Sequence, residues 1–157
     1  MVSESNYFII FVGWITLAAI TFVVLLMIPA PYGRFARSGW GPTLPSSLNW
    51  LLMEVPAVLV FGGLFLGSSE KTVAHWCFFL LWNLHYLYRS LVFPFLILSN
   101  QRVPLTITLS GGAFNVINGW LQAMWLFHLA EPADSSWLRS PVFLMGALLF
   151  LGGFAIR

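Results

Sequence analysis

The feature that most constrains this chain is a series of long apolar runs. Hydrophobic residues make up 59% of its 157 residues and charged residues only 8%, whereas soluble domains carry about 25% charged residues. A lipid bilayer core requires about 20 apolar residues per helix. We expect five segments to form membrane-crossing helices: Tyr7–Ile28, Leu48–Leu66, Val73–Leu98, Pro104–Leu129 and Pro141–Ile156.

The apolar runs predict an all-α membrane protein with one transmembrane domain over residues 1–157, because an open sheet edge is not stable in lipid. A net charge of +2, scattered along the chain, argues against a nucleic-acid partner. The lone Cys77 allows no internal disulfide. The sequence carries no Cys/His metal motif, no glycine-rich phosphate loop and no nucleophile motif. The first run lacks a basic leader and follows Glu4, so we interpret it as a retained span rather than a signal peptide.

The connecting segments suggest where helices begin. Ser68 or Ser69 is placed to cap the third helix, and Pro104 and Pro141 are placed to open the fourth and fifth. Lysine and arginine favour the cytoplasmic side. We therefore expect a cytoplasmic C-terminus and a lumenal or periplasmic N-terminus. One side would hold Arg34, Arg37, Arg102 and Arg157, and the other only Lys71 and Arg139.

Two ionisable residues interrupt the apolar segments. Glu54 and Arg89 both lie about 10 Å from the expected cytoplasmic edge. An ionisable side chain at such a depth costs about 3 kcal/mol and usually marks a functional site. The alternative interpretation is a Glu54–Arg89 ion pair that only holds two helices together.

Other polar residues fall at helical spacings that place them beside these two. One face of the third helix would carry Trp82, His85, Tyr86, Arg89 and Phe93, and one face of the fourth would carry Asn115, Asn118 and Gln122. Together they could surround a cavity that opens to the cytoplasmic side and suits a flat lipophilic ligand with one polar end. Ordinary bundle packing remains the alternative for each face, and a transporter is less favoured because the polar residues cluster in one half. His75 and His128 are expected at the opposite interface, with no role in the site.

Three blocks resemble the steroid 5α-reductase family, especially its plant-type branch: "APYGRFARSGWGPTLPSSLNWLLMEVPA", "LHYLYRSLVFPF" and "FNVINGWLQAMW". The resemblance implies a seven-helix membrane enzyme that reduces the carbon–carbon double bond of 3-oxo-4-ene steroids with NADPH. It also implies that Glu54 and Tyr86 hold the ketone of the substrate as catalytic residues. A carboxyl group in an apolar pocket would stay protonated and donate to the ketone oxygen. With Trp50 and Arg89 they would form the substrate site, while Asn100 and Arg102 would approach the cofactor phosphates.

The family continues beyond the fifth helix with an "IN..SD" stretch and most of its NADPH site, whereas this chain ends in "LLFLGGFAIR". The chain is therefore expected to correspond to the N-terminal, substrate-facing part of the seven-helix bundle and to be inactive alone. Its expected partners are a steroid-like small molecule and membrane lipid. The alternative is a non-catalytic membrane protein or fragment that binds a sterol, an isoprenoid or a partner.

Overall fold

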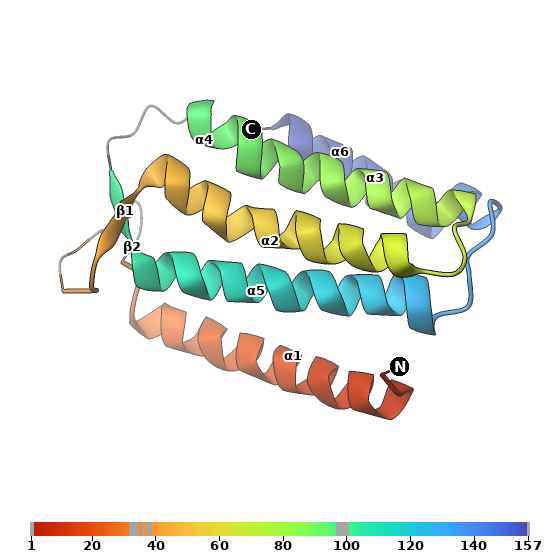
Figure 1. Cartoon of the computed structure of the whole chain (residues 1–157), viewed down its shortest axis with the longest axis horizontal. Helices are drawn as coiled ribbons and strands as arrows, with labels where there is room; N and C mark the ends of the chain where they lie inside the picture. The colour runs from red at the N-terminus through yellow and green to blue at the C-terminus, as the bar shows by residue number, and fades with distance from the viewer. Residues whose placement is uncertain (1, 32–34, 36, 38, 97–100, 157) are drawn as a thin grey trace.

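The computed structural model describes residues 2–31, 35, 37, 39–96 and 101–156. Long helices dominate this part of the chain and lie side by side along the long axis (Figure 1). They are α1 (Glu4–Met27), α2 (Ser46–Gly67), α3 (Val73–Leu87), α4 (Phe93–Leu96), α5 (Leu105–Met124) and α6 (Pro141–Ala155). The view shows α1, α5, α2 and α3 in that lateral order, with α6 behind α3. The five predicted helical segments are therefore present in the described part of the chain, and the end of one of them, Ile97 and Leu98, lies outside it.

Two of the helical segments contain a π-helical turn. Residues Tyr88–Val92 form a π turn that connects α3 to α4, and Trp125–Leu129 form a second one that extends α5. A π turn accommodates one extra residue per turn and often lies at a functional site. The first of these turns carries Arg89, so it sets the direction in which that side chain leaves the helix.

A small antiparallel sheet, which the sequence did not predict, joins two loops. Strand β1 (Thr43–Pro45) pairs with β2 (Arg102–Pro104), with Leu44 opposite Val103. The backbone N–H of Ser46 donates to the carbonyl of Gln101 at 3.2 Å. Since α2 follows β1 and α5 follows β2, the ladder fixes the first turns of these two helices beside each other (Figure 1).

The helix starts confirm two predictions and correct one. Pro141 occupies the first turn of α6, and Pro104 directly precedes α5. The N-cap of α3 is Thr72, not Ser68 or Ser69, because the Thr72 hydroxyl accepts from the backbone N–H of His75 at 3.2 Å. The Ser68 hydroxyl instead donates to the carbonyl of Phe65 at 2.8 Å.

Helix α2 lies at the centre of the bundle and packs against α5 and α3. Its interface with α5 is close at Gly119, where an added Cβ would lie 3.5 Å from the Ala57 carbonyl oxygen. Further along, Phe61 stacks on Trp82 with ring centroids 4.5 Å apart. The indole N–H of Trp82 donates to the Ala57 carbonyl at 3.1 Å, which ties α3 to the same turn of α2.

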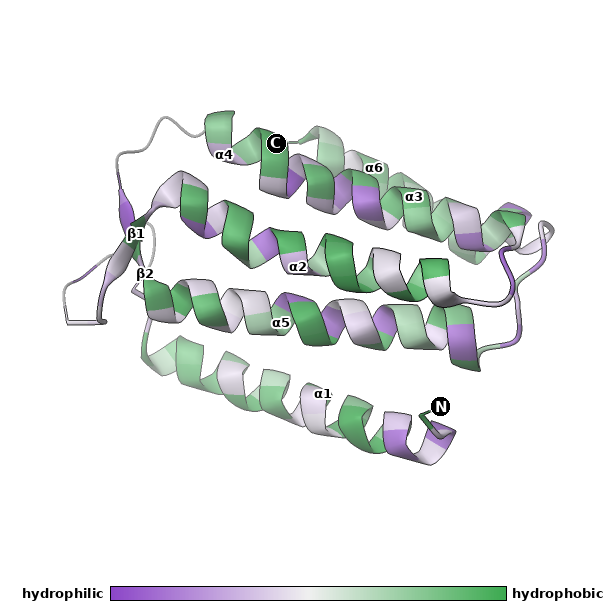
Figure 2. Ribbon diagram, viewed as in Figure 1, coloured by the Kyte–Doolittle hydropathy of each residue, from purple (hydrophilic) through white to green (hydrophobic). Residues whose placement is uncertain are grey.

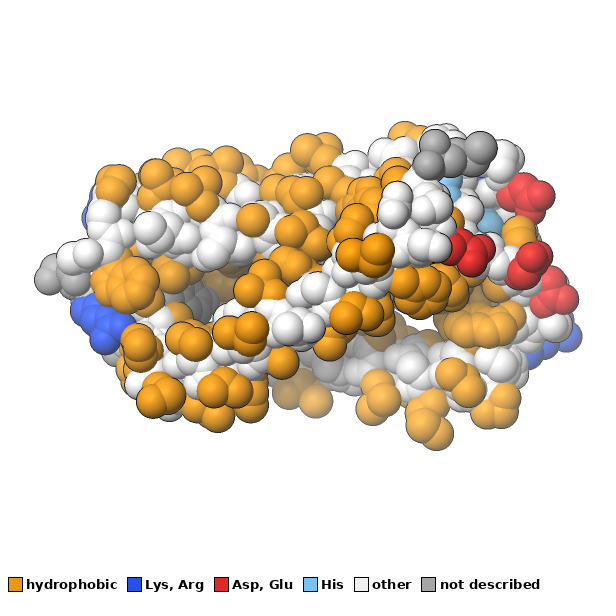
Figure 3. All heavy atoms as spheres, turned by 90° about the horizontal axis from the view of Figure 1, so that it is seen from below, with side chains coloured by type: hydrophobic (Ala, Val, Ile, Leu, Met, Phe, Trp, Pro, Cys, Tyr) orange, Lys and Arg blue, Asp and Glu red, His pale blue; other side chains and the backbone are white. Residues whose placement is uncertain are grey.

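The two outer helices, α1 and α6, have few buried residues. Tyr7 is the buried residue of α1, with its hydroxyl donating to the Leu121 carbonyl at 3.2 Å, and among the described residues of α6 none is buried. Hydrophobic residues predominate along the helices (Figure 2), and the acidic side chains visible on the face in Figure 3 gather at one end. Helices α1 and α2 are long and apolar enough to cross a membrane. The fold is consistent with an all-α membrane protein.

Candidate functional site

The buried acid and the arginine form an ion pair between α2 and the first π turn. Glu54 is 3% exposed, and its Oε1 accepts from the Nε of Arg89 at 2.9 Å and from Nη2 at 2.5 Å. The Arg89 guanidinium also lies 4.8 Å from the ring centroid of Trp50. Trp50 in turn contacts Phe93 edge to face, with ring centroids 5.1 Å apart. The Glu54–Arg89 ion pair, which was one interpretation of the sequence, is therefore present.

A third donor reaches the same carboxylate from α5. The amide nitrogen of Asn115 donates to Glu54 Oε2 at 3.3 Å and to the Met53 carbonyl at 2.7 Å. Met53 lies one helical turn before Pro56, which has no backbone N–H to donate inside α2. Neighbouring helices commonly satisfy carbonyls near such prolines. All three N–H groups donate to Glu54, so the bonding favours an ionised carboxylate over the protonated donor that we expected from the sequence.

The phenol of Tyr86 lies next to this cluster. The side chains of Asn118, Glu54 and Arg89 all lie close enough to its hydroxyl to act on it electrostatically. The ring packs on Trp82 with centroids 4.8 Å apart. Asn115 and Asn118, one helical turn apart on α5, thus each lie beside one residue of the predicted site. Their spacing was visible in the sequence, but their partners were not.

Two adjoining cavities surround these groups. One of about 320 Å³ is lined by the polar cluster and its neighbours: Met53, Glu54, His85, Tyr86, Arg89, Gly111, Phe114 and Asn115. The other, of about 550 Å³, runs between α1 and α5 and is mainly apolar: Trp14, Leu17, Ala18, Thr21, Phe22, Leu25, Ser110, Gly111 and Phe114. Gly111 and Phe114 line both. Together the cavities offer apolar walls and one polar end, which suits a lipophilic molecule with a polar group.

The remaining predicted residues lie elsewhere. Arg102 is exposed in β2, and its Nε and Nη2 donate to the hydroxyl and the carbonyl of Thr43 at 2.9 and 2.7 Å. Asn100, Arg34 and Arg157 fall outside the described residues. Within the described ranges, no group of His, Cys, Asp and Glu could hold a metal ion.

His75 lies in the first turn of α3 and is buried rather than exposed. This side chain is 3% exposed, and its Nδ1 lies 3.2 Å from the carbonyl oxygen of Glu70. The ring packs against Phe127 with centroids 5.4 Å apart. His128 is exposed, and its Nε2 lies 3.0 Å from the Leu64 carbonyl oxygen. The loop 130–140 folds back towards the start of α3, where the Thr72 hydroxyl donates to the Ala133 carbonyl at 3.0 Å. The loop thereby covers His75. The sequence pattern of α3 alone does not reveal this burial.

The fold and the site define a class: an apolar helical bundle of membrane type with a buried acid, arginine and phenol at the end of an apolar cavity. The family model for 3-oxo-5-alpha-steroid 4-dehydrogenase matches residues 101–157. The chain is 37% identical over 148 residues to 3-oxo-5-alpha-steroid 4-dehydrogenase 1 of Bos taurus, covering 90% of this chain and 56% of that protein. It is 34% identical over 141 residues to steroid 5-alpha-reductase DET2 of Gossypium hirsutum, covering 85% and 54%.

Over most of its length the chain is similar to members of the steroid 5α-reductase family, and the family model agrees for residues 101–157. DET2 of Arabidopsis thaliana is 30% identical over 147 residues, covering 87% of this chain and 55% of that protein. The chain spans about half the length of the curated relatives it matches. Animal and plant relatives match at similar identities, so the comparisons support the family and do not single out its plant-type branch.

Proposed function

We propose that this chain forms the substrate-facing part of an NADPH-dependent reductase that acts on the 4,5 double bond of 3-oxo-4-ene steroids or similar lipophilic enones. The observation that carries the proposal is that Gly111 and Phe114 line both the apolar cavity and the polar one. A fused-ring body in the apolar cavity would bring its ketone to Tyr86 and Arg89. The names of the relatives, which are steroid reductases and dehydrogenases, agree with this substrate class.

The polar cluster fits the charge that such a reduction creates. Addition of a hydride to the carbon β to a ketone moves an electron pair onto the ketone oxygen, and a proton then enters at the α carbon. Donors aimed at that oxygen stabilise the developing enolate. The Tyr86 hydroxyl can donate to it, and the side chain of Asn118 lies close to the phenol. Glu54, as a carboxylate, holds the Arg89 charge beside the phenol.

The ring of Trp50 packs against the Arg89 guanidinium and helps to hold it in place. We therefore assign Tyr86 and Arg89 as the hydrogen-bond donors to the ketone oxygen of the substrate. Glu54 and Trp50 position the arginine, which changes the role expected for Glu54 from donor to anchor.

NADPH would supply the hydride when bound. Among the described residues, Arg102 fits one of its phosphates, because its guanidinium is exposed and Thr43 engages only part of its donor set. We assign Arg102 to a cofactor phosphate on this basis. Asn100, the other candidate, lies outside the described residues.

We further propose that all five helical segments cross the membrane, with the β1–β2 end in the cytoplasm. Arg37 is exposed near this end and Arg102 lies in β2 itself, whereas Glu4, Glu70, Glu131 and Asp134 belong to the opposite end. Arginine favours the cytoplasmic face. The N-terminus would then be lumenal or periplasmic. Glu54 lies eight residues into α2, which is about 12 Å from the start of the helix.

One observation favours the non-catalytic alternative. The Glu54 carboxylate already has three N–H donors without any ligand, so the cluster is complete as a link between helices. In that case the same cavities would only bind a sterol or an isoprenoid.

A binding and turnover experiment on the purified chain in lipid nanodiscs tests the proposal. We expect saturable binding of radiolabelled progesterone, which carries the 3-oxo-4-ene group. Tyr86→Phe should weaken binding about fivefold, the value of one hydrogen bond of about 1 kcal/mol. Tyr88→Phe is the matched control, because Tyr88 packs on Phe154 of α6. Equal affinity for the 3-deoxy analogue would refute the ketone contact and favour the non-catalytic alternative. NADPH-dependent product from the purified chain would contradict the expectation that the chain is inactive alone.

A further inference from the structure

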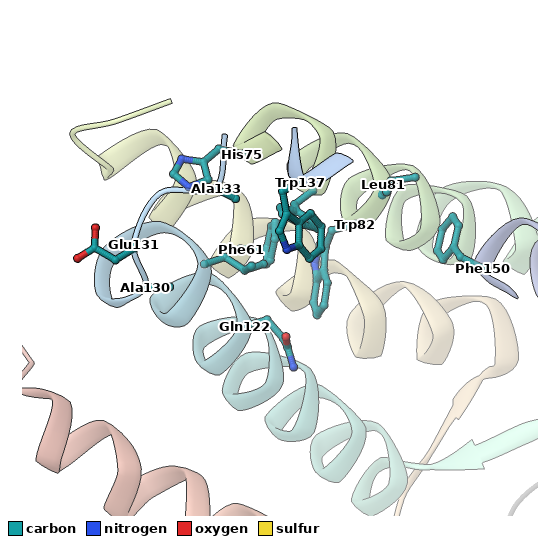
Figure 4. A pocket seen from close by; sticks show the side chains of 12 residues that line it. Phe61, His75, Leu81, Trp82, Gln122, Ala130, Glu131, Ala133, Trp137 and Phe150 are labelled. Atoms are coloured by element: carbon teal, nitrogen blue, oxygen red, sulfur yellow. The ribbon is translucent and has the colours of Figure 1, made fainter. Parts of the chain in front are cut away.

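A separate cavity of about 480 Å³ lies at the end of the bundle opposite the β1–β2 ladder (Figure 4). It is enclosed by the second half of α2, the first half of α3, the end of α5, the loop 130–140 and α6. Its walls are mainly aromatic and include Phe61, Trp82, Trp137 and Phe150. The volume falls in the range of about 300–1,000 Å³ that is typical of small-molecule sites. No residue of the ion-pair cluster lines it.

A buried hydrogen-bond acceptor faces this cavity. His75 lines it, although the side chain is 3% exposed. The Nδ1 atom of His75 lies 3.2 Å from the Glu70 carbonyl oxygen. A carbonyl can only accept, so Nδ1 carries the proton and the Nε2 atom of the neutral ring is an acceptor. Within the described part of the chain, no hydrogen bond to Nε2 is present.

A second polar side chain, the exposed Gln122, also lines this cavity. Gln122 precedes Leu129, the last residue of the helical segment, by seven positions, or about 10 Å. Its amide makes no hydrogen bond with the described residues, and an unpaired amide is unfavourable at this depth in a membrane. Figure 4 shows Gln122 and His75 on different sides of the aromatic group formed by Phe61, Trp82 and Trp137.

We propose that this cavity binds a flat fused-ring lipophilic alcohol that carries a second oxygen at its far end. The hydroxyl of the ligand donates to His75 Nε2, the rings pack between the aromatic walls, and the second oxygen pairs with the Gln122 amide. Because His75 on α3 and Gln122 on α5 line different sides of the cavity, a rigid ring system packed between the aromatic walls could reach both. The proposal does not depend on the reductase function, because the two sites share no lining residue.

Photolabelling of the chain in nanodiscs tests this site. The probe is 5α-androstane-3β,17β-diol carrying a diazirine on the rings, and mass spectrometry locates the label. We expect labelling of peptides that contain Phe61, Trp82 or Trp137. Unlabelled diol should compete better than 5α-androstan-3β-ol, and the hydrocarbon 5α-androstane should not compete. Labelling confined to the cavity between α1 and α5, or equal competition by the hydrocarbon, would overturn the proposal.

Two variants separate binding from folding. His75→Phe keeps a ring against Phe127 but removes the acceptor, and we expect labelling to fall about fivefold, as for one lost hydrogen bond. His128→Phe is the matched control, since this exposed histidine does not line the cavity. Gln122→Leu, at an exposed position, should abolish the preference for the diol over the mono-alcohol. Unchanged labelling in His75→Phe, or an unchanged preference in Gln122→Leu, would each contradict the assigned contact.

Discussion

Removal of Arg89 should destabilise the chain far more than neutralisation of Glu54. Glu54 is 3% exposed, whereas the Arg89 side chain is 30% exposed. In Arg89→Met the carboxylate keeps only the Asn115 contact at 3.3 Å. An uncompensated buried charge of this kind costs about 3–5 kcal/mol.

In Glu54→Gln the arginine still faces the cavity and the Trp50 ring, and the amide oxygen can still accept from it. The amide nitrogen cannot accept from Asn115, so the charge assistance and the 3.3 Å hydrogen bond from Asn115 are lost, which costs about 1–2 kcal/mol. In the double variant no charge remains buried without a partner. The double variant should therefore lose less free energy of unfolding than the two single variants lose in sum, by about 2 kcal/mol or more.

Thermal unfolding of the purified variants in detergent measures this difference. A chain of this length loses about 2–4 °C in Tm per kcal/mol, so Arg89→Met should lower Tm by roughly 6–20 °C and Glu54→Gln by only a few degrees. Equal losses in the two single variants, or strictly additive losses in the double variant, would refute the view that Glu54 is a buried carboxylate neutralised by Arg89.

Three further outcomes are expected. Gly119→Ala should change stability by less than about 1 kcal/mol in denaturant titrations, because the new Cβ meets Ala57 at ordinary contact distance, whereas Gly119→Leu should cost about 1–3 kcal/mol by separating α2 from α5. Trp82→Phe should cost about 1 kcal/mol in the same titrations, since it keeps the stacking but loses the hydrogen bond to the Ala57 carbonyl. Hydrogen bonds from the Ser136 hydroxyl and backbone hold the pKa of Asp134 below its usual value of about 3.9. The stabilisation from Asp134 should therefore be complete above the usual pKa and disappear as the pH falls through the lowered one, and Asp134→Asn should remove this acid dependence from stability measured against pH.

The helical segments could be predicted because apolar length alone determines them in lipid. Their expected starts lie close to the observed ones, as for Val73 in α3 and Pro141 in α6. The β1–β2 ladder could not be predicted, since three-residue strands carry no alternation to detect and each ends in a proline. The π turns were equally hidden, because they depend on packing rather than on composition.

The site was partly predictable for a similar reason. Helical spacing places Tyr86 and Arg89 on one face, and only a few residues are available to neutralise Glu54 in the membrane. The partners on α5 depend on how that helix is rotated and how closely it approaches α2, which Gly119 permits. Spacing along one helix therefore predicts which residues share a face, but not that Asn115 reaches Glu54 or that the loop 130–140 buries His75.

The sequence separations within the ion-pair cluster bear on how the protein is made. Arg89 follows Glu54 by 35 residues, and Asn115 follows it by 61. During synthesis the guanidinium therefore emerges from the ribosome one helix earlier than the amide. If the helical segments insert into the bilayer in order, as proposed, the acid acquires its counter-ion with the next hydrophobic segment, and the larger α2–α5 interface closes only afterwards. The order of synthesis would thus neutralise the buried Glu54 carboxylate before the core of the bundle is complete.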